Sequence, residues 1–187
     1  MTLMEPTLLD LFRADYAAFC RPKGESRRRR RLAFLPRLIT NPSLQAVLIL
    51  RLANRGPAAL GWFWRHVLMA KHAMDFTGRY EIGPGLTLPH PVGILIGPKV
   101  RIGTDVEIAH NVSIGGDAHG RAPVIGDRVH IYPGAVIIGN LTIGEGSVVG
   151  ALSFVTKDVP PNSVVKRGVV EPMRESSFSR AVGSSSS

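Results

Sequence analysis

His90 is the residue of this sequence whose surroundings best suit proton-transfer chemistry. It lies between Pro89 and Pro91 and is followed by Gly93 and a run of aliphatic residues. An imidazole can take a proton from an alcohol because its intrinsic pKa lies near neutral pH, where an alcohol does not ionise unaided. A carboxylate on the other ring nitrogen would fix the tautomer and stabilise the imidazolium. Asp75, fifteen residues earlier, is the candidate for that carboxylate, although it could equally cap a helix.

A six-residue repeat surrounds His90 and extends from residue 82 to about residue 165. An aliphatic residue opens each unit and a small or branched residue takes its fifth position, as in Ile102 and Val106. Neither an amphipathic helix nor an alternating strand repeats at six residues. A β-helix does, because three short flat faces make one coil and the aliphatic residues stack inward as ladders. The sequence therefore predicts a mainly β fold, a parallel β-helix of about four to five coils.

Two further features of the repeat predict details of its local structure. Glycine often follows the leading aliphatic residue, and we expect positive φ angles there. These glycines are at positions 83, 97, 103, 115, 126, 144 and 150. The segment Gly115–Pro123 fits no repeat unit, so we expect it to protrude as a loop from one corner of a coil.

The chain before residue 75 has helical spacing instead. Apolar residues recur at three-to-four-residue steps from Leu8 to Phe19, and Asn41-Pro42-Ser43 is typical of a helix start. The five arginines Arg27–Arg31 repel one another and should be solvated. We expect three parts: a helical region (1–74), the β-helix (75–165) and a C-terminal tail (166–187) that is disordered at its end.

Composition limits the partners. The chain has 187 residues and a formal net charge of +9, which favours anionic ligands. Its single cysteine and the absence of a recognisable signal peptide predict a cytoplasmic protein. No nucleic-acid-recognition fold accompanies the arginines, so we expect no nucleic-acid partner. Trp62, Phe63 and Trp64 would suit a peripheral membrane contact, but we expect them to pack against the coil.

Three segments carry a resemblance to a known family: Ile82–Gly97, Ile114–Gly116 and Val155–Val164. They resemble the hexapeptide-repeat acyltransferases with a left-handed β-helix, and within these the serine acetyltransferase group. The motif around His90 looks closest to members associated with exopolysaccharide biosynthesis. The resemblance, not the spacing, implies the left hand. It also implies an acetyl-CoA-dependent O-acetyltransferase with His90 as the base, Asp75 as its partner, and a homotrimer with active sites between subunits.

The same resemblance implies the binding residues. Acetyl-CoA would lie along the groove between subunits, near a set of small corner residues and one lysine for a phosphate. The set is Gly116, Pro133, Gly134, Gly150, Ala151 and Lys157. Ordinary turns would also explain the small residues. Arg121 is the candidate for binding the acceptor substrate. His110, His119 and His130 lack the spacing of a zinc site, so no metal is predicted.

The acceptor is predicted from departures from the family pattern. Serine acetyltransferases carry Asp before the catalytic His and Arg-His-Pro at the end of the loop, where this chain has Pro89 and Arg121-Ala122-Pro123. A site without those partners should hold serine poorly. The expected acceptor is therefore a hydroxyl of a sugar or polysaccharide precursor. Two alternatives stay open: a serine O-acetyltransferase of cysteine biosynthesis, and a non-catalytic β-helix assembly subunit.

Overall fold

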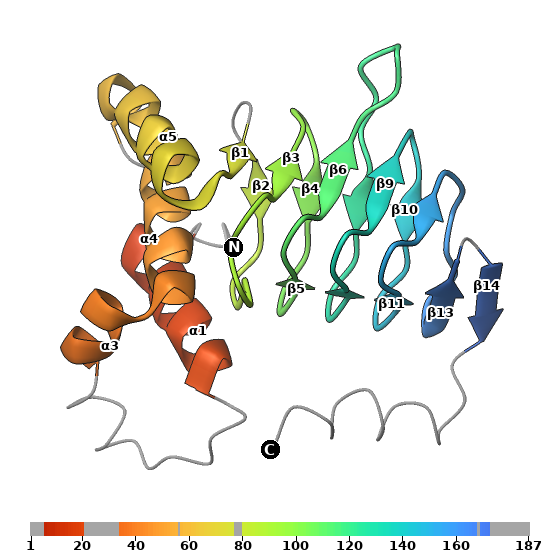
Figure 1. Cartoon of the computed structure of the whole chain (residues 1–187), viewed down its shortest axis with the longest axis horizontal. Coiled ribbons are helices and arrows are strands. Elements are labelled where there is room, and N and C mark those ends of the chain that lie inside the picture. Colours follow the sequence, from red (N-terminus) through yellow and green to blue (C-terminus); the bar gives the residue numbers. More distant parts are fainter. Residues whose placement is uncertain (1–5, 21–33, 56, 77–79, 168, 173–187) are drawn as a thin grey trace, which may run out of the picture.

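Helices cover one end of a stack of β-coils in the computed structural model of the chain (Figure 1). The structure describes residues 6–20, 34–55, 57–76, 80–167 and 169–172. The helices are α1 (Leu8–Cys20), α3 (Phe34–Thr40), α4 (Pro42–Arg55) and α5 (Ala58–His72). The sequence did not predict α3. The arginine run 27–31 and the tail 173–187 lie outside the described residues.

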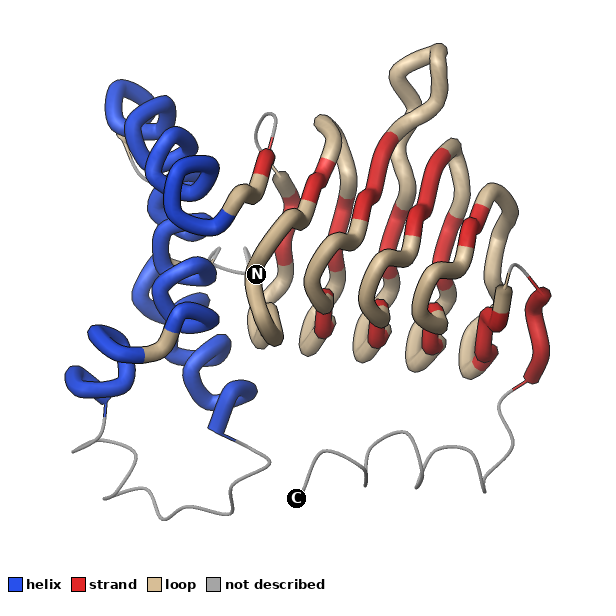
Figure 2. The backbone as a smooth tube through the Cα atoms, viewed as in Figure 1, coloured by secondary structure: helices blue, strands red, loops and turns tan. Residues whose placement is uncertain are grey.

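The coils form a three-sided prism whose faces are three sheets of very short strands (Figure 2). Sheet A contains β1 (Asp75–Phe76), β3 (Leu95–Ile96), β6 (Ser113–Gly115), β9 (Val136–Ile138) and β12 (Phe154–Val155). Sheet B contains β2 (Glu81–Ile82), β4 (Arg101–Ile102), β7 (Val124–Ile125) and β10 (Thr142–Ile143). Sheet C contains β5 (Glu107–Ile108), β8 (His130–Ile131), β11 (Val148–Val149) and β13 (Ser163–Lys166). The last strand, β14 (Val169–Pro172), joins β13 as an antiparallel hairpin.

Ladders of aliphatic side chains fill the prism. In sheet A, Ile96 pairs with Ile114 and Ile114 with Ile137, and these side chains are at most 1% exposed. Burying such a side chain contributes roughly 1.5–3 kcal/mol relative to leaving it in water. The regular six-residue spacing is therefore the pattern of a stacked apolar core, and the predicted parallel β-helix is confirmed.

The predicted reason for the repeat glycines is wrong. None of the glycines that follow the leading aliphatic residues has a positive φ; the positive angles fall elsewhere, for example at Gly85 and Gly134. At Gly83 and Gly144 an added Cβ would lie 2.6 Å and 2.3 Å from backbone atoms of the next coil. Glycine is required at such positions because adjacent coils approach too closely for any side chain.

Three edges separate the faces, and we name them by the sheets they join. The C–A edge includes the turns at residues 89–93, 109–111, 132–134 and 150–152. The A–B edge includes the turns at residues 97–99, 115–123, 139–140 and 156–158. The B–C edge includes the turns at 83–85, 103–105, 126–128 and 144–146. The non-repeating segment 115–123, here called the corner loop, projects from the A–B edge as predicted (Figure 1).

A buried ion pair attaches the helices to the first coil. Arg51 of α4 and Asp15 of α1 are each 1% exposed, and Arg51 Nε and Nη2 donate to the two carboxylate oxygens at 2.9 Å. The guanidinium also donates to the carbonyls of Ile82 and Gly83, and the N–H of Leu86 donates to Asp15. Burial raises the pKa of Asp15, and the bonds from Arg51 oppose that rise. Removing either partner would leave a buried charge uncompensated, so the network fixes how the helices dock.

The expectation for the aromatic residues of α5 is correct only for Trp64. Trp64 packs against the core, whereas Trp62 is 68% exposed and Phe63 is 47% exposed. On a helix, neighbouring residues point in different directions, so three consecutive aromatic residues do not share one face. Among the described residues, no helix is both long enough and apolar enough to cross a membrane.

Candidate functional site

His90 lies exposed on the C–A edge at the end of the first coil. Its φ is +52°, a left-handed conformation that few residues with a side chain adopt. The segment turns tightly because the N–H of Val92 donates to the carbonyl of His90 at 2.8 Å. The N–H of Gly93 donates to the carbonyl of His72, the last residue of α5, at 3.2 Å. Helix α5 thus fixes the turn that presents the imidazole to solvent.

Asp75 opens the same coil that His90 closes. Its carboxylate accepts bonds from Arg65 Nε at 3.2 Å and Nη2 at 2.9 Å, both on Oδ1. Among the described residues it makes no hydrogen bond with His90. Because Arg65 uses only Oδ1, Oδ2 is left to interact with another donor. The pairing of Asp75 with His90 therefore stays a prediction.

Four of the predicted cofactor residues share the C–A edge with His90. Pro133 and Gly134 form the turn of the third coil, and Gly150 and Ala151 that of the fourth. Gly134 has a φ of +70°, and an added Cβ at Gly150 would lie 2.7 Å from the carbonyl of Val165. The backbone geometry of these turns already accounts for glycine at both positions, so a role in binding a pantetheine arm stays a prediction.

The other predicted binding residues lie on the A–B edge. Gly116 and Arg121 belong to the corner loop, and Lys157 lies in the turn of the last coil. An added Cβ at Gly116 would lie 2.6 Å from the carbonyl oxygen of Arg121, so the base of the loop closes only with glycine there. The structure therefore sorts the predicted site into two edges that flank the outer face of sheet A.

The face between these two edges carries an apolar surface. Its outward ladder contains Asp75, Leu95, Ser113, Val136 and Phe154. Phe154 is 58% exposed, and Leu152 beside it on the C–A edge is 82% exposed. Large apolar side chains this exposed mark a surface that suits a protein contact.

Two histidines near His90 were not predicted to belong to the site. The ring of His110, in the equivalent turn of the second coil, has its centroid 6.1 Å from that of His90 at an interplanar angle of 82°. His72 is 4% exposed beneath the His90 turn. His110 Nδ1 and His72 Nε2 are buried without a hydrogen-bond partner in the described part of the chain. Aligning the turns of successive coils would have placed His110 beside His90; no sequence pattern marks His72.

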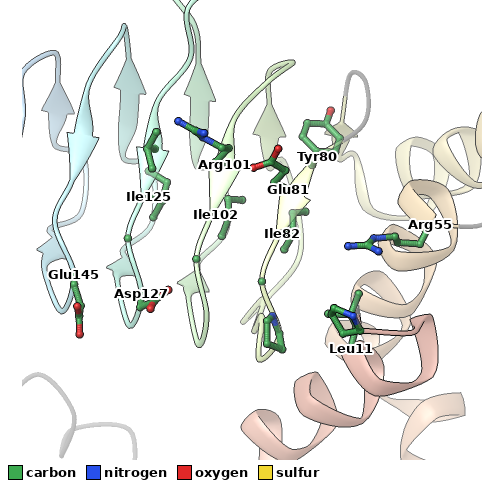
Figure 3. A pocket seen from close by; sticks show the side chains of 16 residues that line it. Leu11, Arg55, Tyr80, Glu81, Ile82, Arg101, Ile102, Ile125, Asp127 and Glu145 are labelled. Atoms are coloured by element: carbon green, nitrogen blue, oxygen red, sulfur yellow. The ribbon is translucent and has the colours of Figure 1, made fainter. Parts of the chain in front are cut away.

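A groove lies elsewhere, on sheet B and the B–C edge. Its volume is about 570 Å³, and its lining includes Tyr80, Arg101 and Asp127 from the coils and Leu11 and Arg55 from the helices (Figure 3). Its charged side chains have both signs and His90 does not line it, so we do not place the site there. In the described residues, no three His, Cys, Asp or Glu side chains are grouped as a metal site would need.

Comparison with known proteins agrees with the fold. The bacterial transferase hexapeptide (six repeats) family matches residues 122–157. A serine acetyltransferase of Mycobacterium tuberculosis is 37% identical over 138 residues, which cover 66% of this chain and 57% of that protein. A mitochondrial serine acetyltransferase of Arabidopsis thaliana is 47% identical over 94 residues, 49% of this chain and 24% of that protein. The chain thus spans about half or less of these relatives.

Solved structures extend the match. Soybean serine acetyltransferase in complex with serine has a TM-score of 0.72 and 31% identity, covering 89% of this chain and 70% of that one. The serine acetyltransferase of Neisseria gonorrhoeae has a TM-score of 0.75 and 27% identity, covering 89% of this chain and 66% of that one.

The repeat and the stacked coils define a hexapeptide-repeat transferase with a left-handed β-helix, as predicted. Within that class, the extent and identity of the match to the soybean structure are decisive. The chain belongs to the serine acetyltransferase family.

The predicted sugar or polysaccharide acceptor is wrong. The relatives and solved structures named above are all serine acetyltransferases. The prediction gave too much weight to Pro89 and Ala122, two departures at positions expected to contact serine. Specificity depends on all the contacts of a site, so these two departures do not by themselves identify another acceptor.

Proposed function

We propose that this chain is a serine O-acetyltransferase that moves the acetyl group of acetyl-CoA to the side-chain hydroxyl of L-serine. The observation that carries the proposal is the match, over 70% of its length, to a serine acetyltransferase complexed with serine. The exposed imidazole of His90 on the C–A edge provides a base suited to that reaction.

In this proposal His90 accepts the hydroxyl proton while the serine oxygen attacks the thioester carbonyl carbon. The resulting oxyanion accepts hydrogen bonds from backbone N–H groups, for which Gly116 is the candidate. The carbon–sulfur bond then breaks, and the leaving thiolate takes the proton from the imidazolium. Oδ2 of Asp75 would orient the ring, while Arg65 holds Oδ1.

The active site is proposed to lie between two chains of a homotrimer. His90 and the corner turns at Gly134 and Gly150 lie on the C–A edge, whereas Arg121 and Lys157 lie on the A–B edge. If the C–A edge of one chain meets the A–B edge of the next, the base, the cofactor groove and the acceptor site come together. The exposed Leu152 and Phe154 support such a contact.

A thiol-release assay with acetyl-CoA tests the function. We expect turnover with L-serine and little with homoserine. Replacing His90 by Ala should lower kcat by about 10²–10⁴-fold while acetyl-CoA still binds, because general-base catalysis contributes that much. His66→Ala, which removes an exposed histidine of α5, is the matched control and should keep full activity.

Two outcomes would contradict the proposal. A wild-type chain that binds acetyl-CoA but releases no thiol with L-serine would be a binding or assembly subunit. Full activity of the His90→Ala variant would show that His90 is not the base. It would not affect the assignment of L-serine as the acceptor.

A further inference from the structure

Backbone hydrogen bonds within the corner loop hold the loop closed. The N–H of Asp117 donates to the carbonyl of Arg121 at 2.8 Å, and the N–H of Gly120 donates to the carbonyl of Asp117 at 3.0 Å. Lys99 Nζ donates to the carbonyl of Gly120 at 3.3 Å and ties the loop tip to the second coil. The loop therefore projects as a compact unit with a defined shape.

The carboxylate of Asp117 divides its two oxygens between the backbone and one side chain. Oδ1 accepts the N–H groups of His119 at 2.9 Å and Arg121 at 3.0 Å. Oδ2 accepts Arg121 Nε at 2.8 Å and lies 2.7 Å from Nη2. The Asp117 side chain is 19% exposed and that of Arg121 is 58% exposed. A shielded carboxylate thus fixes an arginine that remains open to solvent.

The contacts with Asp117 occupy one side of the Arg121 guanidinium and leave its outer end uncontacted by Asp117. The Nε–H donates to Asp117, and Nη2 makes the ion-pair contact with the same carboxylate oxygen. The end formed by Nη1 and the outer Nη2–H has no partner among the described residues. Two parallel N–H groups at that end match the two oxygens of a carboxylate. Asp117 and Arg121 together are neutral, which suits a zwitterionic amino acid better than a polyphosphate.

We infer that Asp117 is a positioning residue that holds Arg121 ready to bind the carboxylate of the acceptor amino acid. The inference rests on the proposed function and adds a residue of this chain to it. Arginine loses considerable side-chain freedom when it binds a ligand, and a guanidinium already held in place loses less. Hydrogen bonds, chiefly that from the backbone N–H of Arg121, lower the pKa of Asp117, so its charge persists at neutral pH.

Asp117→Asn tests this role because asparagine keeps the size and removes the charge. We expect the KM for L-serine to rise about tenfold, with kcat and the KM for acetyl-CoA within about twofold of wild type. Asp127→Asn is the matched control: its carboxylate accepts the N–H of Thr104 at 2.7 Å on the B–C edge, so the KM for serine should not change. An unchanged or lower KM for serine in Asp117→Asn would overturn the inference. So would a rise confined to acetyl-CoA, which would assign Arg121 to a phosphate.

A second variant tests whether Asp117 acts through Arg121. Adding Asp117→Asn to Arg121→Lys should raise the KM for serine no further than Arg121→Lys alone, because both changes remove the same interaction. Fully additive effects would show that Asp117 acts on its own and would overturn the inference.

An NMR measurement separates this inference from the proposed function. The Arg121 Nε–H signal of the full chain should be protected from exchange in wild type and lose protection in Asp117→Asn. L-serine should shift the signal, whereas ethanolamine, which lacks the carboxylate, should not. Absence of serine turnover with these NMR results intact would remove only the proposed reaction. Equal protection in both proteins, or equal shifts with both compounds, would overturn the positioning role.

Discussion

At the scale of single residues, Asp75 has a hydrogen-bond partner that the sequence did not predict. Its two bonds come from Arg65 of α5, both to Oδ1. Arg65 and Asp75 have side chains 38% and 33% exposed, so the pair adds at most about 1 kcal/mol to stability. A pair of that strength is better suited to orienting a carboxylate than to holding the fold together.

Replacement of Asp75 by Asn should therefore affect catalysis more than stability. We expect kcat to fall by between about tenfold and 10⁴-fold, the upper value being the loss seen when a base loses its carboxylate partner. Thermal unfolding should shift by only a few degrees. Steady-state kinetics and a melting curve on one preparation provide both values. A lower melting temperature with unchanged kcat would make Asp75 a structural residue of the helix-to-coil junction.

At the scale of elements, the end of α5 and the His90 turn form one unit. His72 lies buried under the turn, and its carbonyl accepts the N–H of Gly93. Burial, helped by the charge of Lys71, lowers the pKa of His72 below its ordinary value of 6.5, although the carbonyl of Pro91 opposes this. The folded state is therefore more stable when the His72 imidazole is neutral, and protonation of this ring favours unfolding.

The sign of this shift predicts how stability depends on pH. The contribution of neutral His72 is complete above pH 6.5 and is lost as the pH falls through the lower pKa of the folded state. We expect the urea midpoint of the wild-type chain to drop between pH 7.5 and pH 5 more than that of His72→Leu. His66→Leu, at an exposed site, should behave as wild type. Equal pH dependence in the wild type and His72→Leu would contradict the assignment.

At the scale of the whole molecule, two edges of the prism each carry half of the proposed site. His90 and Arg121 are on opposite borders of sheet A. In a closed cyclic assembly each chain would offer one edge to each neighbour, so every site would combine residues of two chains.

Mixed assemblies test that arrangement. His90→Ala and Arg121→Ala chains should each be nearly inactive with serine at low concentration. After joint unfolding and refolding in equal amounts, about one quarter of the random interfaces would pair an intact His90 with an intact Arg121. Activity should then return to about one quarter of wild type. No recovery, from a mixture shown by size and mass to contain hybrid assemblies, would place both residues in a site within one chain.

The sequence alone determined the coil, its apolar ladders, the projecting corner loop and the family. Each of these rests on a periodicity or a short motif, which neighbouring residues define by themselves. It also singled out His90, because a short motif surrounds it. It did not give the acceptor, because Pro89 and Ala122, which depart from the family pattern, are only two residues of a larger site.

Only the tertiary structure decided which residues meet. The Arg51–Asp15 pair joins residues from separate helices, and the carboxylate of Asp75 pairs with Arg65. Gly83 is required by the backbone of the next coil and not by its own φ. These outcomes depend on how coils stack and how helices dock, and no local pattern in the chain encodes that geometry.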